Sequence, residues 1–226
     1  KKEKSLVVYD LEFCGDIRES LSSCHIFNIA AVELVSGKYF NVFVKLDMEI
    51  IPEPANSTLP RITHKLLNDK DALPFTKAME IFNIWLPDTP ILISHNNFRS
   101  DKPIIELECK RKGFDLPYEW YFFDSLIFLR HHFPKLPSYT LNAIYNHVFG
   151  EDIKNIHEAL YDCFALRELL IHVGIYNLNG TLYPTRCTPL QCIKGIGIAS
   201  EQIFFNNKIH SVNELISILY RNYTVQ

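Results

Sequence analysis

The amino-acid sequence predicts an α/β protein in which helices flank a mixed β-sheet, followed by a small helical domain. Short β-branched and aromatic runs come first, and Ser36-Gly37 is a turn signal between two of them. Apolar strands then alternate with segments of helical periodicity as far as residue 173. Turn-forming residues at 176–184 interrupt this pattern. They predict one domain over residues 1–176 and a second over residues 184–226.

The expected strands differ in character along the chain. Residues 4–13 are β-branched and aromatic with acids at alternate positions, whereas residues 90–94 are wholly apolar, as in buried parallel strands. The first three strands follow one another closely, which predicts an antiparallel start to the sheet. The complete set is 4–13, 26–35, 39–46, 90–94 and 120–124.

Helices are expected where apolar residues recur at helical spacing. The prolines of residues 52–60 predict a loop instead, and Pro103 is compatible with the first turn of a helix. The longest expected helix carries an apolar set of Leu160, Cys163, Phe164, Leu166, Leu169 and Leu170. The expected helices are 63–67, 75–86, 101–112, 125–132, 138–148 and 158–173.

The composition indicates a folded, soluble protein. Hydrophobic residues make up 47% and charged residues 22% of 226 residues, which permits a sizeable core. No apolar run approaches the roughly 18–20 residues that cross a bilayer, and the first residues do not resemble a signal peptide. The scattered cysteines favour reduced thiols over disulfides or over a zinc site at Cys187 and Cys192. We therefore expect an intracellular protein of the cytoplasm or nucleus, without a membrane partner.

Four carboxylates are candidates for a metal site. Asp10 and Glu12 lie two residues apart in a strand, so both face the same side of the sheet. Neighbouring carboxylates repel each other unless cations lie between them; an edge strand with a wet face is the structural alternative. Asp101 follows an apolar strand at the start of a helix, where an acid also complements the helix dipole. Asp162 lies among apolar residues, five positions after His157, although a solvent-facing position would also explain it.

Together these motifs resemble the DEDD-type 3′→5′ exonucleases of ribonuclease H-like fold, in the DEDDh (DnaQ-like) branch. The resemblance covers roughly residues 6–170. The tyrosine branch of the family has a tyrosine four residues before the last acid, whereas this chain has Glu158 there. Compared with the second family motif, Arg99-Ser100 is an insertion before Asp101. The matching segments are Val-Tyr-Asp-Leu-Glu at 8–12, Ile-Phe-Asn-Ile-Ala-Ala-Val at 26–32, Ser-His-Asn-Asn-Phe-Arg-Ser-Asp at 94–101, Phe-Asp-Ser-Leu at 123–126, Ser-Tyr-Thr-Leu at 138–141 and the pair His157 and Asp162.

The resemblance implies a catalytic role for each motif residue and a cofactor of two divalent cations, Mg²⁺ or Mn²⁺. Asp10, Glu12 and Asp162 would hold the first cation, and Asp10 with Asp101 the second. His157 would remove a proton from the attacking water. Five helical residues correspond to about 500° of rotation, so His157 is expected in the loop or first turn before the helix that carries Asp162.

By the same resemblance, several residues would contact the substrate, although burial in the core is an equal alternative for the aromatic ones. An aromatic surface suits sequence-tolerant binding of single strands. The net charge of −3 is compatible with an enzyme that grips only a few terminal nucleotides. The candidates are Leu11, Phe13, Asn97 and Phe98 near the carboxylates, and His64 in a more weakly matching loop.

The C-terminal segment Ile-Lys-Gly-Ile-Gly at 193–197 resembles a helix-hairpin-helix module. There Lys194 and the backbone amides at Gly195 and Gly197 would bind a phosphate. Glu201 departs from the usual pattern, so a structural cap or a protein-binding hairpin stays open as an alternative.

The favoured partner is therefore a nucleic-acid 3′ end, with single-stranded DNA preferred over RNA because such modules most often hold DNA. A polymerase or another replication or repair protein is a further candidate partner. The alternatives are a 3′→5′ exoribonuclease that trims RNA or short oligonucleotides, and a catalytically silent module that binds nucleic acid or a polymerase. The silent module would be expected to lack a metal ligand, whereas all four acids are present.

Overall fold

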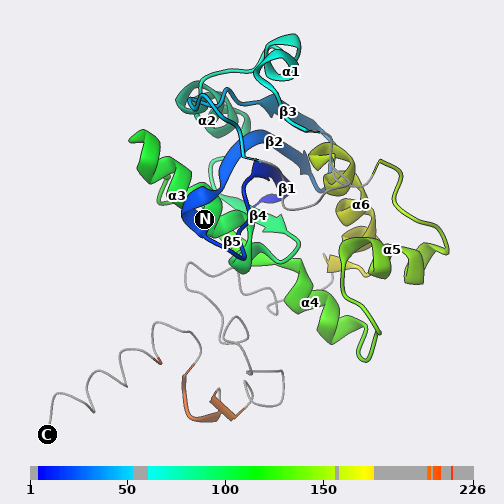
Figure 1. Ribbon diagram of the computed structural model, residues 1–226. Helices are drawn as coiled ribbons and strands as arrows, with labels where there is room; N and C mark the ends of the chain where they lie inside the picture. Colours follow the sequence, from blue (N-terminus) through cyan, green and yellow to red (C-terminus); the bar gives the residue numbers. More distant parts are fainter. Residues whose placement is uncertain are drawn as a thin grey trace, which may run out of the picture. The chain divides into compact units, whose positions relative to one another are not determined.

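The computed structural model describes residues 5–52, 61–155 and 158–175, together with residues 203, 204, 206–209 and 215 (Figure 1). The chain divides into two compact units, Lys1–Leu182 and Tyr183–Gln226. In the second unit, residues 203, 204, 206 and 215 are helical. The predicted helix-hairpin-helix turn lies outside the described residues and stays a prediction.

The first unit contains a mixed five-stranded sheet with the strand order β3-β2-β1-β4-β5. β2 is antiparallel to both β1 and β3, whereas β4 and β5 run parallel to β1. The predicted fold class and the antiparallel start of the sheet are therefore confirmed. The strands are β1 (Ser5–Cys14), β2 (His25–Glu33), β3 (Tyr39–Phe43), β4 (Pro90–Ser94) and β5 (Tyr121–Asp124).

The helices agree with the predicted ones except at a few ends. α5 begins at residue 141 instead of 138, because the Thr140 hydroxyl accepts the backbone N–H of Ala143 and so caps the helix there. Two short 3₁₀ turns, η1 (Leu21–Ser23) and η2 (Asn97–Arg99), carry no periodicity and were not predicted. The helices of the described part are α1 (His64–Asp69), α2 (Phe75–Trp85), α3 (Asp101–Lys112), α4 (Ser125–His132), α5 (Leu141–Phe149) and α6 (Ala159–His172).

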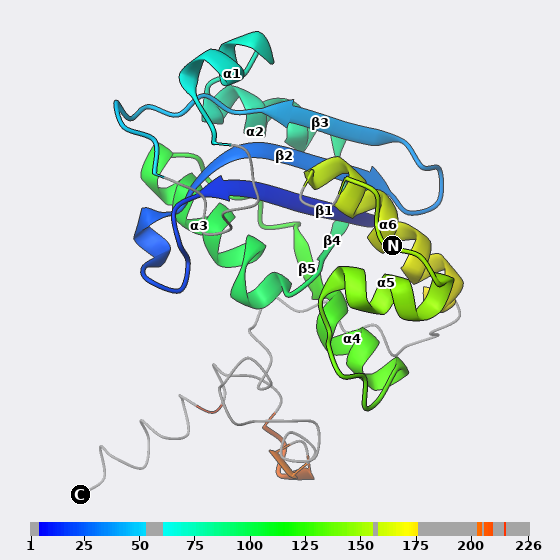
Figure 2. The same cartoon turned by 45° about the vertical axis from the view of Figure 1, so that its right-hand side comes forward.

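Helices cover both faces of the sheet (Figure 2). α6 packs on one face against β1 and β2, where the Cys163 thiol lies 3.6 Å from the carbonyl oxygen of Ala30. α2 covers part of the other face, with Phe82 stacked near the ring of Phe40. Side chains at even positions of β1, such as Val8, therefore point toward α6.

One predicted core residue of α6 is exposed. Phe164 retains 38% of its surface and meets the ring of Tyr39 edge-on, with ring centroids 6.1 Å apart. Cys163, Leu166, Leu169 and Leu170 are buried as predicted. Phe164 is left exposed because the sheet beneath α6 ends at the edge strand β3.

The described part of the chain has no disulfide. Cys14, Cys24, Cys109 and Cys163 are buried and free. Within the same part, no helix is both long enough and apolar enough to cross a membrane.

Candidate metal centre

Three carboxylates from two elements converge on the face of the sheet that α6 covers. Asp10 and Glu12 extend from β1, and Asp162 lies in the first turn of α6. One carboxylate oxygen from each lies within 4.8 Å of the others. Hard divalent cations prefer such clusters of carboxylate oxygens. The predicted grouping of these three acids is therefore what the structure shows.

The backbone around Glu12 is irregular in a way that favours this convergence. The pairing of β1 with β2 shifts register between Glu12 and Phe13, as in a β-bulge, which re-aims neighbouring side chains. Gly15 follows with φ +88°, and a Cβ there would lie 2.3 Å from the carbonyl oxygen of Ser23. Only glycine fits this close approach, by which the chain turns away just beyond the carboxylates.

The fourth predicted ligand, Asp101, is more deeply buried than the other three. It is 3% exposed and is not part of the three-residue group. Its Oδ1 accepts the backbone N–H of Leu11 at 3.1 Å, and its Oδ2 accepts the hydroxyl of Ser94 at 2.6 Å. β4 pairs with β1 only as far as Val8, so the Asp101 carboxylate replaces a strand carbonyl as the partner of Leu11.

The carboxylates raise one another's pKa values. Burial, followed by the charges of Asp101, Glu12 and Asp162, raises the pKa of Asp10 well above its usual value. Burial, followed by the charge of Asp162, raises the pKa of Glu12 to about 8. Burial raises the pKa of Asp101 to about 7 despite its hydrogen bonds. A group of acids that resists ionisation is relieved by a bound cation, so the electrostatics fit a divalent metal.

The raised pKa of Glu12 makes the stability of the metal-free protein depend on pH. Between the usual value of 4.5 and the folded value of about 8, the folded state binds more protons than the unfolded state. The free energy of unfolding should therefore fall as the pH rises through this range, by an amount on the order of a few kcal/mol. Urea denaturation in the presence of a chelator at several pH values measures this slope.

Glu12→Gln supplies the matched control for that measurement, because the amide does not titrate and should make the slope shallower, while Asp10 and Asp101 still contribute to it. Adding Mn²⁺ should oppose the loss at high pH, since the cation binds the ionised carboxylates. A chelated protein that gains stability from about pH 5 to about pH 8 would contradict the assigned electrostatics.

A buried hydrogen-bond network holds the turn before Asp101. The Tyr9 hydroxyl donates to Oδ1 of Asn97 at 2.6 Å, and the Asn97 amide donates to the carbonyl oxygen of Phe123 at 2.9 Å. Asp124 accepts the backbone N–H of Phe98 at 3.1 Å. Tyr9 was not predicted as a site residue, although a tyrosine inside an apolar strand needs a buried partner and so indicates a network.

His95 in the same turn is a structural residue. Its Nε2 lies 2.8 Å from the carbonyl oxygen of Tyr139, which can only accept, so Nε2 carries the proton. Its Nδ1, 3.1 Å from Oγ of Ser125, therefore accepts the hydroxyl proton. Burial lowers the pKa of His95 to about 4, so the ring stays neutral and joins the turn to α4 and to the loop before α5.

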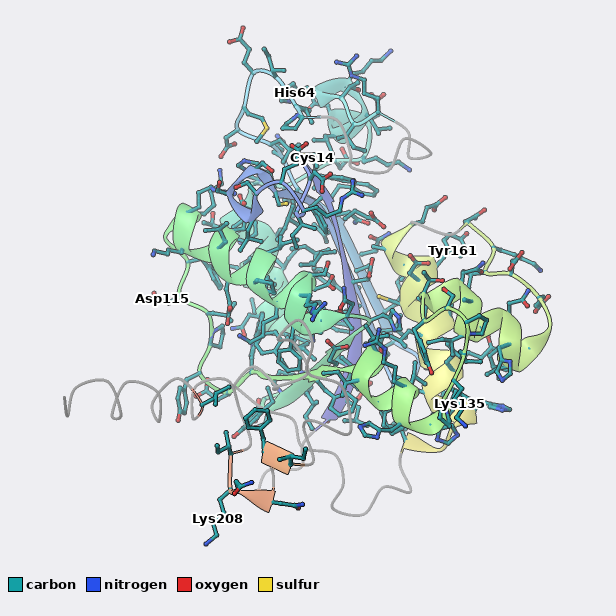
Figure 3. All side chains as sticks on the ribbon, turned by 60° about the horizontal axis from the view of Figure 1, so that its bottom comes forward. Cys14, His64, Asp115, Lys135, Tyr161 and Lys208 are labelled. Atoms are coloured by element: carbon teal, nitrogen blue, oxygen red, sulfur yellow. The ribbon has the colours of Figure 1, made fainter. Side chains whose placement is uncertain are left out.

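The residues predicted to contact the substrate differ in their exposure. Leu11, Asn97 and Phe98 are buried, and the polar atoms of Asn97 form hydrogen bonds that hold the turn. Phe13 keeps part of its surface, and His64 is exposed on α1, with Nε2 2.8 Å from the carbonyl oxygen of Met48 (Figure 3). Contact with substrate stays a prediction for all five. His157, Lys194, Gly195 and Gly197 lie outside the described residues.

Comparisons with known proteins identify the family and the fold of this chain. Residues 7–170 match the family model described as Exonuclease. A structure of exonuclease I is similar with a TM-score of 0.62 and 19% identity, over 74% of this chain and 40% of that chain. Exonuclease I of E. coli in complex with a dA16 oligonucleotide is similar with a TM-score of 0.63 and 17% identity, over 77% of this chain and 42% of that chain.

Cell-death related nuclease 4 is similar with a TM-score of 0.54 and 19% identity, over 75% of this chain and 64% of that chain. At these identities the solved structures show the shared fold. The chain spans about two fifths of the length of exonuclease I. No protein with a curated description matches the sequence.

Proposed function

Because the chain belongs to the exonuclease family and has the carboxylates of a DEDD-type nuclease, we propose that it removes nucleotides from the 3′ end of single-stranded nucleic acid with two divalent cations. The enzyme is a hydrolase of a metal-dependent family. The observation that carries the proposal is the convergence of Asp10, Glu12 and Asp162 within 4.8 Å, on the face of the sheet that α6 covers.

Each acidic residue has a distinct part in the proposed mechanism. Asp10, Glu12 and Asp162 would hold one cation, and Asp10 with Asp101 a second, Mg²⁺ or Mn²⁺. Each Asp101 oxygen accepts one hydrogen bond and keeps a further lone pair, through which Asp101 would hold a water molecule of the second cation. When bound, the cations supply Lewis-acid polarisation of water and phosphate oxygens. His157 would take the proton from the attacking water.

DNA is the proposed substrate in preference to RNA. The reason is the resemblance of residues 193–197 to a helix-hairpin-helix turn, whose backbone amides suit the phosphates of DNA. The structures of E. coli exonuclease I with dA16 and dT13 show that a protein of this fold accommodates single-stranded DNA.

A product ladder tests direction, substrate and metal together. The protein is incubated with 5′-labelled single-stranded and duplex DNA and RNA, with Mn²⁺, with Mg²⁺ and with a chelator. We expect metal-dependent shortening from the 3′ end, fastest on single-stranded DNA. Faster shortening of RNA would favour the exoribonuclease alternative, discrete internal cuts would indicate an endonuclease, and binding without cleavage would indicate a silent module.

Removal of the C-terminal unit should weaken binding of long substrates without affecting the chemistry. A chain that ends at Tyr183 keeps all the catalytic carboxylates, so rates on very short oligonucleotides should hardly change. Affinity for longer strands should fall, and the salt dependence of binding should become shallower by about 0.7–0.9 per lost phosphate contact. Titrations at several salt concentrations measure both effects.

Gly197→Pro tests the same contact within the full chain, because it removes one backbone N–H and leaves the charge unchanged. It should reproduce part of the loss for long strands. Equal losses on short and long substrates would instead make the unit a structural part of the exonuclease domain.

A further inference from the structure

The strand β3 lies at the edge of the sheet and shares a face with the metal centre. Pairing places Asp10 beside Ala30 and Ala30 beside Asn41, so Asn41 lies on the carboxylate face. By the same register, Tyr39 and Phe43 also lie on this face, since alternate residues of a strand point the same way. Strands are about 4.8 Å apart, so β3 lies roughly 10 Å from β1.

The side chains of β3 on this face are suited to contacts with nucleotides. Tyr39 is 61% exposed, and it meets Phe164 edge-on, which leaves ring surface accessible. Asn41 is exposed; its Oδ1 accepts the amide of Asn28 at 2.8 Å, so its own amide nitrogen is the donor at the surface. Phe43 is half-buried. Along this face of β3, an aromatic, an amide and a second aromatic side chain therefore follow one another, and successive ones lie about 7 Å apart.

Lysines lie at both ends of β3, with Glu33 of β2 opposite Lys38. Lys38 precedes the strand, Lys45 follows it, and the Lys70 ammonium lies 5.5 Å from the centroid of the Phe43 ring. No acidic residue occurs between Lys38 and Lys45, and the next acid along the chain, Asp47, is paired with Lys112 at 2.7 Å. A chain of phosphates is complementary to such a surface.

The face of β3 is also open. Figure 2 shows α6 in front of β1 and β2, while β3 runs along the margin of the sheet. In the described part of the chain, no strand pairs with the outer edge of β3, and the Leu73 N–H donates to the carbonyl oxygen of Phe43 at the end of the strand. An exposed sheet face with aromatic residues can stack the bases of single strands.

We propose that Tyr39, Asn41, Phe43 and Lys70 form a track for single-stranded nucleic acid that leads away from the carboxylates. The track lies two strands, or roughly 10 Å, from β1. A base stacks on Tyr39, Phe43 packs beneath the Lys70 ammonium, and phosphates contact Lys70 and the Asn41 amide. The inference rests on the proposed exonuclease function, because it assigns the path of that substrate.

Tyr39→Ala tests the track in an Asp10→Asn background, where hydrolysis stops and binding is measured by the fluorescence anisotropy of a labelled oligothymidylate of 12 nucleotides. We expect Kd to rise roughly 5- to 100-fold, the range that one base–aromatic stack supplies. Lys70→Gln should lower the salt slope of binding by about 0.7. Tyr118→Ala and Lys110→Gln are the matched controls, since both residues are exposed and lie outside β3.

A second measurement uses hydrolysis. In the otherwise native protein, Tyr39→Ala should lower kcat/KM on the 12-nucleotide strand and leave that on a dinucleotide unchanged. Unchanged binding in Tyr39→Ala, or an equal loss in Tyr118→Ala, would overturn the track. A Tyr39→Ala variant that changes oligomeric state in size-exclusion chromatography while keeping the native Kd would overturn it in favour of an interface between copies.

Failure of the track and failure of the proposed function are distinguishable. If the native protein digests single strands and Tyr39→Ala binds and digests them as well, only the track is wrong. If the native protein digests nothing, yet binding still depends on Tyr39 and Lys70, the track stands and the exonuclease proposal fails.

Discussion

Asp10→Asn is expected to abolish hydrolysis and to raise the melting temperature of the metal-free protein. Asp10 is proposed to hold both cations, and metal stabilisation of the transition state amounts to several kcal/mol, so the rate should fall at least about 10³-fold. At the same time the amide removes a buried charge whose pKa is raised by Asp101, Glu12 and Asp162. Relief of about 1 kcal/mol would raise Tm by about 2–4 °C for a protein of this size.

The pH dependence separates this explanation from a general improvement in packing. The gain in Tm should be largest near pH 8, where the neighbouring acids ionise, and should shrink near pH 5, where they hold protons. Asp115→Asn is the control, because Asp115 is exposed on the connection after α3 and lies outside the elements that carry the four acids (Figure 3). Native activity in Asp10→Asn, or a large loss of metal-free stability, would sink the assignment of the metal centre.

Local sequence signals predicted the elements well where a single feature decides the structure. The wholly apolar run of β4 and the helix that starts at Asp101 have the predicted ends, because polar residues separate them. The positions that were missed depend on contacts between distant segments. Tyr9 and Asn97 are 88 residues apart, and no local pattern links them. Likewise, periodicity placed Phe164 in the core, but only the width of the sheet decides which flank of α6 stays exposed.

In the metal centre, too, the features set by local sequence were predicted and those set by distant contacts were not. The spacing of Asp10 and Glu12 predicts a shared face, because alternation along a strand is a local rule. The position of Asp101 is not local: its carboxylate is buried because β1 extends beyond the end of β4 and leaves the Leu11 N–H without a strand partner. The sequence context of Asp101 is compatible with two interpretations: an acid that complements the helix dipole, or a metal ligand. Its hydrogen bonds show that it also supports the strand that carries the other acids.

His157→Ala is expected to lower the rate about 10²–10⁴-fold while leaving metal binding intact, the usual effect of removing a general base. α6 begins at Ala159, two residues after His157, and Asp162 lies in its first turn. The helix start agrees with the prediction that His157 precedes the helix and so need not share a helical face with Asp162.

Three variants separate a base from a ligand and from a structural residue. Mn²⁺ affinity, measured by titration calorimetry, should be native in His157→Ala and reduced in Asp162→Asn. His131→Ala, on the exposed side of α4, should keep both the native rate and the native affinity. The imidazole changes charge near neutral pH, so the native rate should rise with pH across this range and His157→Ala should lose that rise. If His157→Ala loses Mn²⁺ affinity as severely as Asp162→Asn, His157 is a metal ligand and the proposed proton transfer is wrong.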